Sequence, residues 1–313
     1  MDVLSQVTDA MRTGRPRFVR VEGHHPWRRR LRPVPGTAFH VLLRGSCRLV
    51  PPAGDPIGLG VGDVVLLPNG HGHGIADSCA APLQDSDPAL DEEFGENART
   101  VTLGSAEPGG PAAPTVLLSG VFPLDQSWCH PVVNGLPDVV HVQAQLRREP
   151  PLRVVLELLR EESEGAGMGA DSVISSLLDT LLLYTLRVWY QEHGVGRGWG
   201  PALNDVAISR VLCRIHNDPG GKWTVEGLGE EAGLSRSAFA RRFTELVGQP
   251  PLSYLTWLRM NMAAQRLRDS EEPLGAIAQR VGYTSEFAFA AAFKRLYGTA
   301  PGAYRRQERS VMA

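Results

Sequence analysis

Histidine is the first residue type in this sequence that could do chemistry, and the chain has nine histidines. Three of them, His40, His71 and His73, stand in or beside short apolar runs of the N-terminal half. A neutral imidazole can hydrogen-bond a ligand, and three imidazoles together suit zinc or iron. Four more histidines could complete an irregular site: His24, His25, His130 and His141. No spacing fixes such a geometry, and His71 and His73 could simply cap a turn. We take His40, His71 and His73 as candidate ligand-binding residues and predict no metal and no other cofactor.

Cysteine is the second reactive type. The four cysteines are spread over 313 residues without a CxxC pair, so we expect neither a disulfide scaffold nor a zinc knuckle. A thiol reacts as its thiolate, and Cys129 beside His130 could have a lowered pKa. The candidate redox residues are Cys47, Cys79 and Cys129. The alternative is that each is a small buried hydrophobe.

The C-terminal part contains one pattern twice, first as VEGLGEEAGLSRSAFARRF and then as LGAIAQRVGYTSEFAFAAAF. When Gly233 is aligned with Gly282, the flanking apolar residues match, and Ser235 and Ser285 follow as candidate helix N-caps. Each glycine stands where a helix would end in a left-handed cap. The pattern predicts two helix-turn-helix units, joined by a helix over 252–268 that is roughly 25 Å long at 1.5 Å per residue.

This part of the chain, residues 204–306, resembles the C-terminal DNA-binding domain of AraC/XylS-family transcription regulators. Three stretches support the resemblance: WTVEGLGEEAGLSRSAFARRF, GQPPLSYLTWLRMNMAAQRL and PLGAIAQRVGYTSEFAFAAAFKRLYGTAPGAYRR. It implies double-stranded DNA as a partner, with the second helix of each unit in the major groove, and RNA polymerase as another. One departure is Gly229, where the first unit usually has Ala, because glycine weakens a helix by about 1 kcal/mol relative to Ala.

The resemblance places candidate DNA-binding residues on both recognition helices. Arg236 and Arg241 of the first can make bidentate contacts to guanine, whereas Arg242 points elsewhere and could meet a phosphate or a carboxylate of the domain. The second helix has few hydrogen-bonding groups, so we expect more positioning than specificity from it. The expected DNA-binding residues are Ser235, Arg236, Ser237, Ala240, Arg241, Ser285, Glu286, Phe287, Ala290 and Lys294.

Residues 36–77 contain a second family motif, G(X)5PXG(X)2H(X)3N. Its first four fixed positions are matched by Gly62, Pro68, Gly70 and His73. Asp77 replaces the asparagine, and the segment HPVVNGLPDVVHV at 130–142 extends the likeness to the N-terminal cupin of a subset of AraC-type regulators. Catalytic cupins need a metal held by an HXH pair, a Glu and a later His, and the pair and the Glu are absent here. The resemblance therefore implies a sensor of a small-molecule effector or redox signal and no enzyme. The alternative is a metal-dependent cupin enzyme fused to a DNA-binding domain.

The elements that position these residues change along the chain. Short apolar runs cut by turns predict a β-barrel or sandwich over 14–142. Helices are expected at 152–162 and 171–192, and the second is apolar nearly all round. Such a helix is either buried or shared with a second subunit, so we expect a homodimer. Four glycines within 193–200 indicate a linker.

Composition and charge limit the classes of protein to which the chain can belong. A hydrophobic content of 42% with 21% charged residues excludes wholesale disorder. No apolar run reaches 18 residues and no apolar signal core opens the chain, so we expect no membrane span and a cytoplasmic protein. The net charge of −2 conceals a division, since residues 203–313 hold 15 Lys and Arg against 11 Asp and Glu and are +4, which leaves −6 for the rest.

These patterns together predict an α+β chain of two domains. Residues 1–193 would form a cupin-like β-barrel with dimerisation helices, 194–202 a linker, and 203–313 an all-α domain with two helix-turn-helix units. The resemblance implies that the whole is a sequence-specific, DNA-binding transcription regulator.

Overall fold

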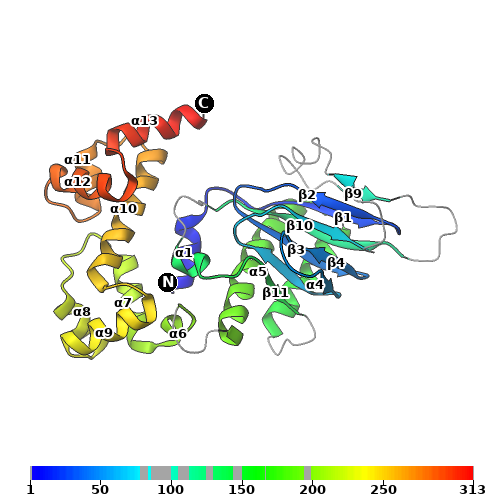
Figure 1. The fold of residues 1–313 in the computed structure, drawn as a ribbon, viewed down its shortest axis with the longest axis horizontal. Coiled ribbons are helices and arrows are strands. Elements are labelled where there is room, and N and C mark those ends of the chain that lie inside the picture. The colour runs from blue at the N-terminus through cyan, green and yellow to red at the C-terminus, as the bar shows by residue number, and fades with distance from the viewer. Residues whose placement is uncertain are drawn as a thin grey trace. The chain divides into compact units, whose positions relative to one another are not determined.

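Two compact units form in the computed structural model (Figure 1). The first in sequence is Met11–His193, and the second is Gly194–Ala313 together with Met1–Ala10. The structure describes residues 2–77, 84–85, 100–104, 113–124, 130–143, 150–165, 167–193 and 199–312. A sheet-rich N-terminal unit and a helical C-terminal unit confirm the predicted α+β fold class.

Two sheets make up the barrel of the N-terminal unit. The larger has the strand order β11-β6-β3-β10-β1-β9. Its strands in chain order are β1 (Arg17–Gly23), β3 (Thr37–Arg44), β6 (Val64–Leu67), β9 (Thr100–Leu103), β10 (Thr115–Phe122) and β11 (Val140–Val142). The pairing of β10 with β3 places Ser119 opposite His40.

The smaller sheet has the order β5-β4-β7-β2-β8. Its strands are β2 (Arg28–Leu31), β4 (Cys47–Val50), β5 (Ile57–Leu59), β7 (His73–Ala76) and β8 (Gln84–Asp85). Strand β7 joins β2 to β4, with antiparallel pairing on both sides. This places His73, the first residue of β7, within the smaller sheet.

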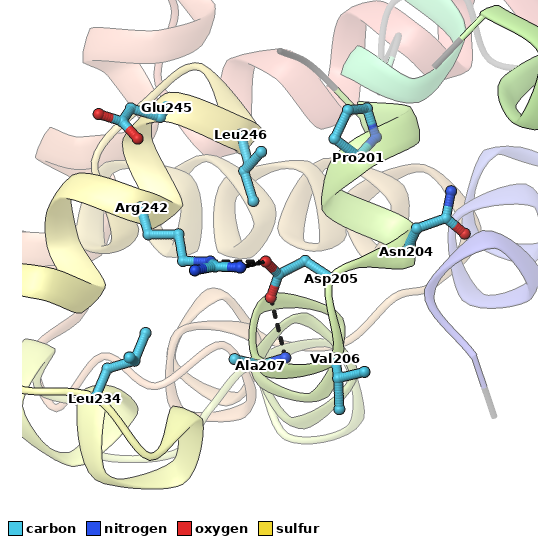
Figure 2. Close-up of a pocket in the computed structure, with 9 residues that line it drawn as sticks. All are labelled: Pro201, Asn204, Asp205, Val206, Ala207, Leu234, Arg242, Glu245 and Leu246. Carbon is cyan, nitrogen blue, oxygen red and sulfur yellow. Dashed lines mark hydrogen bonds and ion pairs between the residues drawn. The ribbon is translucent and has the colours of Figure 1, made fainter. Parts of the chain in front are cut away.

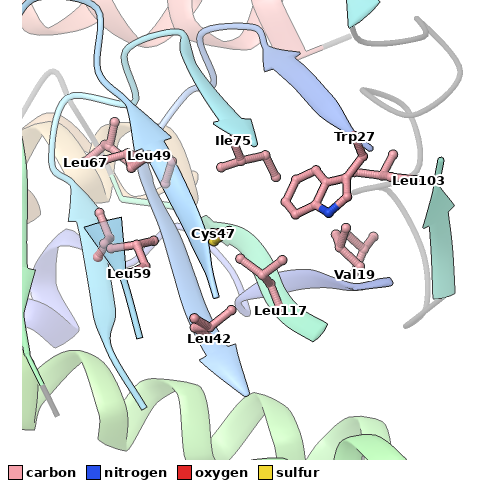
Figure 3. Packing of buried hydrophobic residues seen from close by; sticks show 13 residues of the cluster. Val19, Trp27, Leu42, Cys47, Leu49, Leu59, Leu67, Ile75, Leu103 and Leu117 are labelled. Atoms are coloured by element: carbon pink, nitrogen blue, oxygen red, sulfur yellow. The ribbon is translucent and has the colours of Figure 1, made fainter. Parts of the chain in front are cut away.

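The core of this unit is built by side chains from both sheets (Figure 3). Leu42, Leu67 and Leu117 come from the larger sheet, and Leu49 and Ile75 from the smaller one. Strands β6, β7 and β10 are buried along their whole length, which is expected of strands that are covered on both faces. Strands β3, β4 and β6 lie on three of the short apolar runs of the sequence, at 39–43, 47–50 and 64–67.

Three helices complete the N-terminal unit. The short α3 (Pro131–Asn134) begins after His130, whose Nδ1 accepts a hydrogen bond from the N–H of Val132 at 3.1 Å. Helices α4 (Pro150–Glu164) and α5 (Ala170–His193) pack on each other. The buried hydrophobic side chains of α5 are Ile174, Leu178, Leu181, Leu182, Leu186, Val188 and Tyr190.

Part of the apolar surface of α5 is not buried within the N-terminal unit. Leu177, Leu183 and Tyr184 are half-buried, and Val173 is 41% exposed. Among the described residues, α5 is the one helix long and apolar enough to cross a membrane by those two criteria. A helix buried inside a globular domain can meet the same two criteria. In α5, 44% of the 18-residue window that meets them is buried.

Helices make up the C-terminal unit. In chain order they are α6 (Trp199–Asn204), α7 (Val206–Asn217), α8 (Val225–Ala232), α9 (Arg236–Val247), α10 (Pro251–Asp269), α11 (Leu274–Arg280), α12 (Glu286–Tyr297) and α13 (Pro301–Met312). Most of helix α1 (Val3–Met11) is grouped with this unit, and Gln6 donates a hydrogen bond to Asn217 of α7. Helix α6 occupies part of the expected linker 194–202, whose first residues lie outside the described ones.

Candidate nucleic-acid interface and a buried histidine pair

The two predicted turns have the same hydrogen-bond pattern. At the end of α8, the N–H of Gly233 donates to the carbonyl of Glu230 and the N–H of Leu234 to that of Gly229, both at 2.9 Å. At the end of α11, the N–H of Gly282 donates to Gln279 at 3.0 Å, and the next residue donates to Ala278 at 2.8 Å. The glycines have φ values of +69° and +81°, which confirms the predicted left-handed conformation.

The helix after each turn begins at a serine cap, as predicted. Ser235 Oγ accepts from the N–H of Ala238 at 3.4 Å, and Ser285 Oγ accepts from the N–H of Ala288 at 3.3 Å. The phenylalanine pair that follows each cap is buried, with ring centroids 5.5 Å apart in α9 and 5.8 Å apart in α12. Cap and core together fix which face of each helix is left outside.

The outer face of α9 contains the predicted DNA-binding residues. Arg236, Ser237 and Arg241 are exposed, and Ala240 is half-buried. A glycine at 229 suits the turn that precedes this helix, because a Cβ there would lie 3.0 Å from the carbonyl oxygen of Leu234. Alanine would thus be tight at this position, although glycine weakens α8.

The outer face of α12 is chemically different. Glu286 and Lys294 are exposed, Ala290 is half-buried, and the ring of Phe287 is 86% exposed. The helix presents apolar groups suited to thymine methyls and one carboxylate that can accept from cytosine.

The side chain of Arg242, on α9, points toward Asp205 (Figure 2). It is thereby held away from the outer face of α9. Its Nε donates to Oδ2 of Asp205 at 2.7 Å, and its NH2 group forms an ion pair with the same carboxylate. Asp205 also caps α7, since Oδ1 accepts from the N–H groups of Ala207 and Ile208 at 3.0 and 2.9 Å. Of the two partners that the sequence left open for Arg242, the structure shows the carboxylate.

The charge on Asp205 is stabilised by these contacts. Burial acts to raise the pKa of Asp205, but the N–H of Ile208 and the guanidinium of Arg242 outweigh it and lower the pKa below its ordinary value. The carboxylate lies in a surface pocket with Leu246 and Val206 on its wall (Figure 2). This pocket lies within the C-terminal unit, and its lining residues come from α6, the start of α7, the turn before α9 and α9 itself.

Two of the three candidate ligand-binding histidines meet between the sheets. His40 Nε2 lies 2.6 Å from His73 Nε2, and both side chains are buried, with 2% and 5% of the residue exposed. His73 Nδ1 lies 2.8 Å from the carbonyl oxygen of His71, and His40 Nδ1 lies 2.8 Å from Ser119 Oγ. The side chain of His71 is exposed, with Nδ1 3.7 Å from Asp138.

The acceptors in this chain of contacts fix its proton positions. A carbonyl only accepts, so His73 Nδ1 donates to His71 and its Nε2 has the lone pair. His40 Nε2 must then donate to His73, and His40 Nδ1 accepts from the hydroxyl of Ser119. Burial lowers the pKa of His40 well below its ordinary value, helped by His73, and burial also lowers the pKa of His73. Both rings are therefore neutral.

The candidate redox cysteines divide into one that is described and two that are not. Cys47 is a buried member of the barrel core (Figure 3), and burial, with Asp63 and Asp77 adding to it, raises the pKa of its thiol to about 12. The protonated thiol is the form that this surrounding favours. Cys79 and Cys129 lie outside the described residues.

Sequence reasoning missed two residues that complete these arrangements. Ser119 meets His40 only through strand register, which no local pattern reveals. Asp205 precedes an apolar periodic segment and is a recognisable N-cap signal, so its cap could have been found. Within the described ranges, no three His, Cys, Asp or Glu side chains gather as a metal site would require.

Comparison with known proteins gives matches over both units. The Cupin family model matches residues 2–191, and the Helix-turn-helix domain model matches 228–307. The chain is 29% identical to the HTH-type transcriptional regulator AlkR of Acinetobacter baylyi, over 98% of this chain and 100% of that one. It is 32% identical to a protein of Streptomyces lividans described as an AraC-like transcription regulator, over 86% of each chain. A solved DNA-binding domain of AdpA, in complex with a target DNA, is 33% identical with a TM-score of 0.31, covering 32% of this chain and 90% of that one.

Proposed function

Because the chain belongs to the AraC-like transcription regulators with an N-terminal cupin domain, we propose that α9 and α12 recognise a specific promoter sequence and that the cupin domain adjusts this binding to a chemical signal. DNA binding and transcription regulation are the function of the family. The residues that read the sequence, the signal and the assembly are the proposal.

The observation that supports DNA recognition is the outer face of α9. Arg236 and Arg241 are exposed, and neither forms a hydrogen bond or ion pair with another side chain of the described residues. Arg242, one residue further on, is instead held by Asp205. Two unoccupied guanidinium groups on a capped helix suit bidentate contacts to guanine.

The two recognition helices divide the work in this proposal. The polar face of α9, with Ser237 and Ala240 between its arginines, supplies most of the sequence specificity. Helix α12 positions the domain through Lys294 at the phosphates and reads thymine methyls with Phe287 and Ala290. Glu286, at the start of α12, selects a base by accepting a hydrogen bond from cytosine. Ser235 and Ser285 set the start of each helix and so place these side chains.

The proposed signal acts on the barrel around His40 and His73. A small-molecule effector that bonds with either imidazole must displace one of its present partners, because each Nε2 is occupied by the other ring and each Nδ1 by Ser119 or the carbonyl of His71. Such an effector shifts DNA affinity only if it binds one state of the protein better than another. A redox signal would act on Cys79 or Cys129, since Cys47 is held as a protonated thiol.

The proposed assembly is a homodimer in the cytoplasm that also contacts RNA polymerase. Val154 and Leu158 of α4 are 58% and 41% exposed, and Val173 of α5 is exposed as well. A second copy of these helices would bury such apolar side chains. We further propose that the cupin domain has no enzymatic activity, because the HXH pair and the Glu of catalytic cupins are missing from the sequence.

The test is a selection of DNA by the full chain. The purified protein is incubated with a pool of randomised duplexes, and the bound fraction is sequenced over several rounds. Enrichment of one motif, with tighter binding to it than to random duplex, is the expected result. Binding that is equal on enriched and random DNA would contradict the proposal. The same assay with and without candidate metabolites or oxidants then tests the cupin domain as the sensor.

A further inference from the structure

The turn of the second helix-turn-helix unit lies directly against a loop of the first. Residues 218–224 connect α7 to α8, and Gly220 in this loop approaches the end of α11. A Cβ placed on Gly220 would lie 2.7 Å from the carbonyl oxygen of Arg280, and one on Gly282 would lie 2.7 Å from the carbonyl oxygen of Gly220. The backbones of the two units are thus as close as glycine allows at this point.

Arg259, at the middle of α10, holds this contact. Its Nε donates to the carbonyl of Pro219 and its NH2 donates to the carbonyl of Gly221, both at 2.7 Å. The same NH2 lies at the turn of the second unit, since a Cβ on Gly282 would be 2.7 Å from it. The guanidinium carbon also lies 6.0 Å from the ring centroid of Tyr283, the residue after that turn. One side chain therefore contacts both units.

The position of Arg259 along α10 explains why one contact can set the geometry. Tyr254, on the N-terminal side, packs on Phe243 of the first unit. From Met260 onward, the buried side chains of α10 belong to the core of the second unit, together with Ile277, Phe289 and Phe293. Arg259 stands where the helix passes from one unit to the other. Without it, α10 would be the main connection, and a single helix can bend and twist.

We propose that Arg259 is a positioning residue that fixes the distance and angle between α9 and α12, and so determines the base-pair spacing between the two DNA sub-sites that one chain accepts. The inference rests on the proposed recognition of DNA by both helices. Each base pair inserted between the sub-sites moves one relative to the other by about 3.4 Å and rotates it by about 34°. A rigid pair of helices cannot follow this change, whereas a loosened pair can.

Three variants disturb the contact, two at Arg259 and one in the loop that it holds. Arg259→Met keeps the stem of the side chain but removes every donor, and Arg259→Lys leaves one point charge that cannot bond both carbonyls in the same way. Gly220→Ala leaves Arg259 intact but forces the loop away from Arg280. The matched control is Arg266→Met on the same helix, because Arg266 pairs with Glu272 inside the second unit, at 3.3 Å.

The experiment measures binding to the site that the wild-type chain selects from randomised duplexes, and to the same site with one or two base pairs inserted between its halves. For the wild-type chain and Arg266→Met, we expect the insertion to weaken binding by about 30-fold or more, the size of one or two lost base contacts. For Arg259→Met and Gly220→Ala, we expect a penalty of at most about 3-fold, with Arg259→Lys in between. The ratio of the two affinities is unchanged if part of a variant sample is unfolded.

Three results would overturn the inference. If Arg259→Met keeps the wild-type insertion penalty, Arg259 does not set the spacing, although the proposed function still stands. If the wild-type chain selects a two-part site but tolerates the insertion, the units are not held rigidly and the inference fails in the same way. A wild-type chain that selects no sequence contradicts the proposed function and the inference with it.

Discussion

The carboxylate of Asp205 and the guanidinium of Arg242 join the start of α7 to the face of α9 that is turned away from its exposed arginines. The same carboxylate caps α7 through two backbone N–H groups. One side chain thus begins a supporting helix and ties it to a recognition helix.

Replacing Asp205 by Ala should destabilise the DNA-binding unit by about 1–2 kcal/mol, chiefly through the lost N-cap. Arg242 is half exposed, so its ion pair contributes little in water, and Arg242→Ala should cost less than about 1 kcal/mol. Hydrogen exchange of the α7 amides in the full chain measures both changes. Equal losses in the two variants would show that the ion pair, and not the cap, dominates.

Arg241→Ala should weaken binding to the selected DNA site by about 1–3 kcal/mol and leave binding to random duplex nearly unchanged. The matched control is Arg242→Ala, which removes a guanidinium one residue away that is held by Asp205. Fluorescence anisotropy with labelled duplexes gives both affinities. If the Arg241 variant loses as much on random DNA as on the selected site, Arg241 contacts only phosphates.

The contact between His40 and His73 should appear as a coupling energy. Each single substitution by Leu leaves one buried imidazole nitrogen without its partner, which costs about 1–3 kcal/mol. The double variant removes both polar groups, so its loss should be smaller than the sum of the single losses. Urea unfolding, monitored through hydrogen exchange of the amides of β3 and β7, measures the loss of stability in each variant. Simple additivity would mean that the two rings do not bond with each other in solution.

The stability of the C-terminal unit should fall as the solution becomes acidic, because of His216. Its Nε2 lies 2.6 Å from the hydroxyl of Tyr254, and burial lowers the pKa of His216 to about 4. Below about pH 6.5 the unfolded chain binds a proton that the folded chain does not, so stability is lost as pH falls toward 4. The loss attributable to this residue between about pH 7.5 and pH 5 is on the order of 2 kcal/mol.

A His216→Gln variant isolates this effect, because glutamine stays neutral over the whole range. Hydrogen exchange of the α10 amides, corrected for the intrinsic pH dependence of exchange, should show a smaller pH effect in the variant than in the wild-type chain. An unchanged pH effect would assign it to other groups of the unit.

Cys47 should resist alkylation in the folded protein. Its thiol is buried and its pKa is raised to about 12, so almost no thiolate is present near neutral pH. Mass spectrometry after a short iodoacetamide pulse should find Cys47 unlabelled in native protein and labelled in urea. Rapid native labelling would restore Cys47 as a redox candidate. Cys47→Ala should therefore leave any oxidant response of DNA binding intact.

Local chemistry in the sequence predicted the DNA-binding unit well. Gly233 and Gly282 predict left-handed turns, and Ser235 and Ser285 predict the starts of helices. These predictions succeed because each residue lies within a few positions of the turn or helix start that it determines. The helix expected over 252–268 corresponds to α10, which spans Pro251–Asp269. Helix α13 was not predicted, since its sequence RRQERS has no apolar period to mark a buried face.

The buried histidine pair shows where such prediction stops. His40 and His73 are 33 residues apart, and their contact depends on the packing of one sheet against the other. Ser119 joins them from a third strand, 79 residues from His40. The motif indicated that His73 lies in a barrel, but no pattern in one sequence states which side chain faces it. The direction of Arg242 was undecided for the same reason, because its partner Asp205 is 37 residues away.

The paired turns at Gly233 and Gly282 have a consequence for how target genes are found. One chain contains two recognition helices whose outer residues differ, so the stretch of DNA that it covers has no reason to be palindromic. Two chains can then occupy a direct repeat as well as an inverted one. Genome searches for this regulator should score asymmetric motifs and both repeat orientations, since a filter for inverted symmetry would discard single sites and direct repeats.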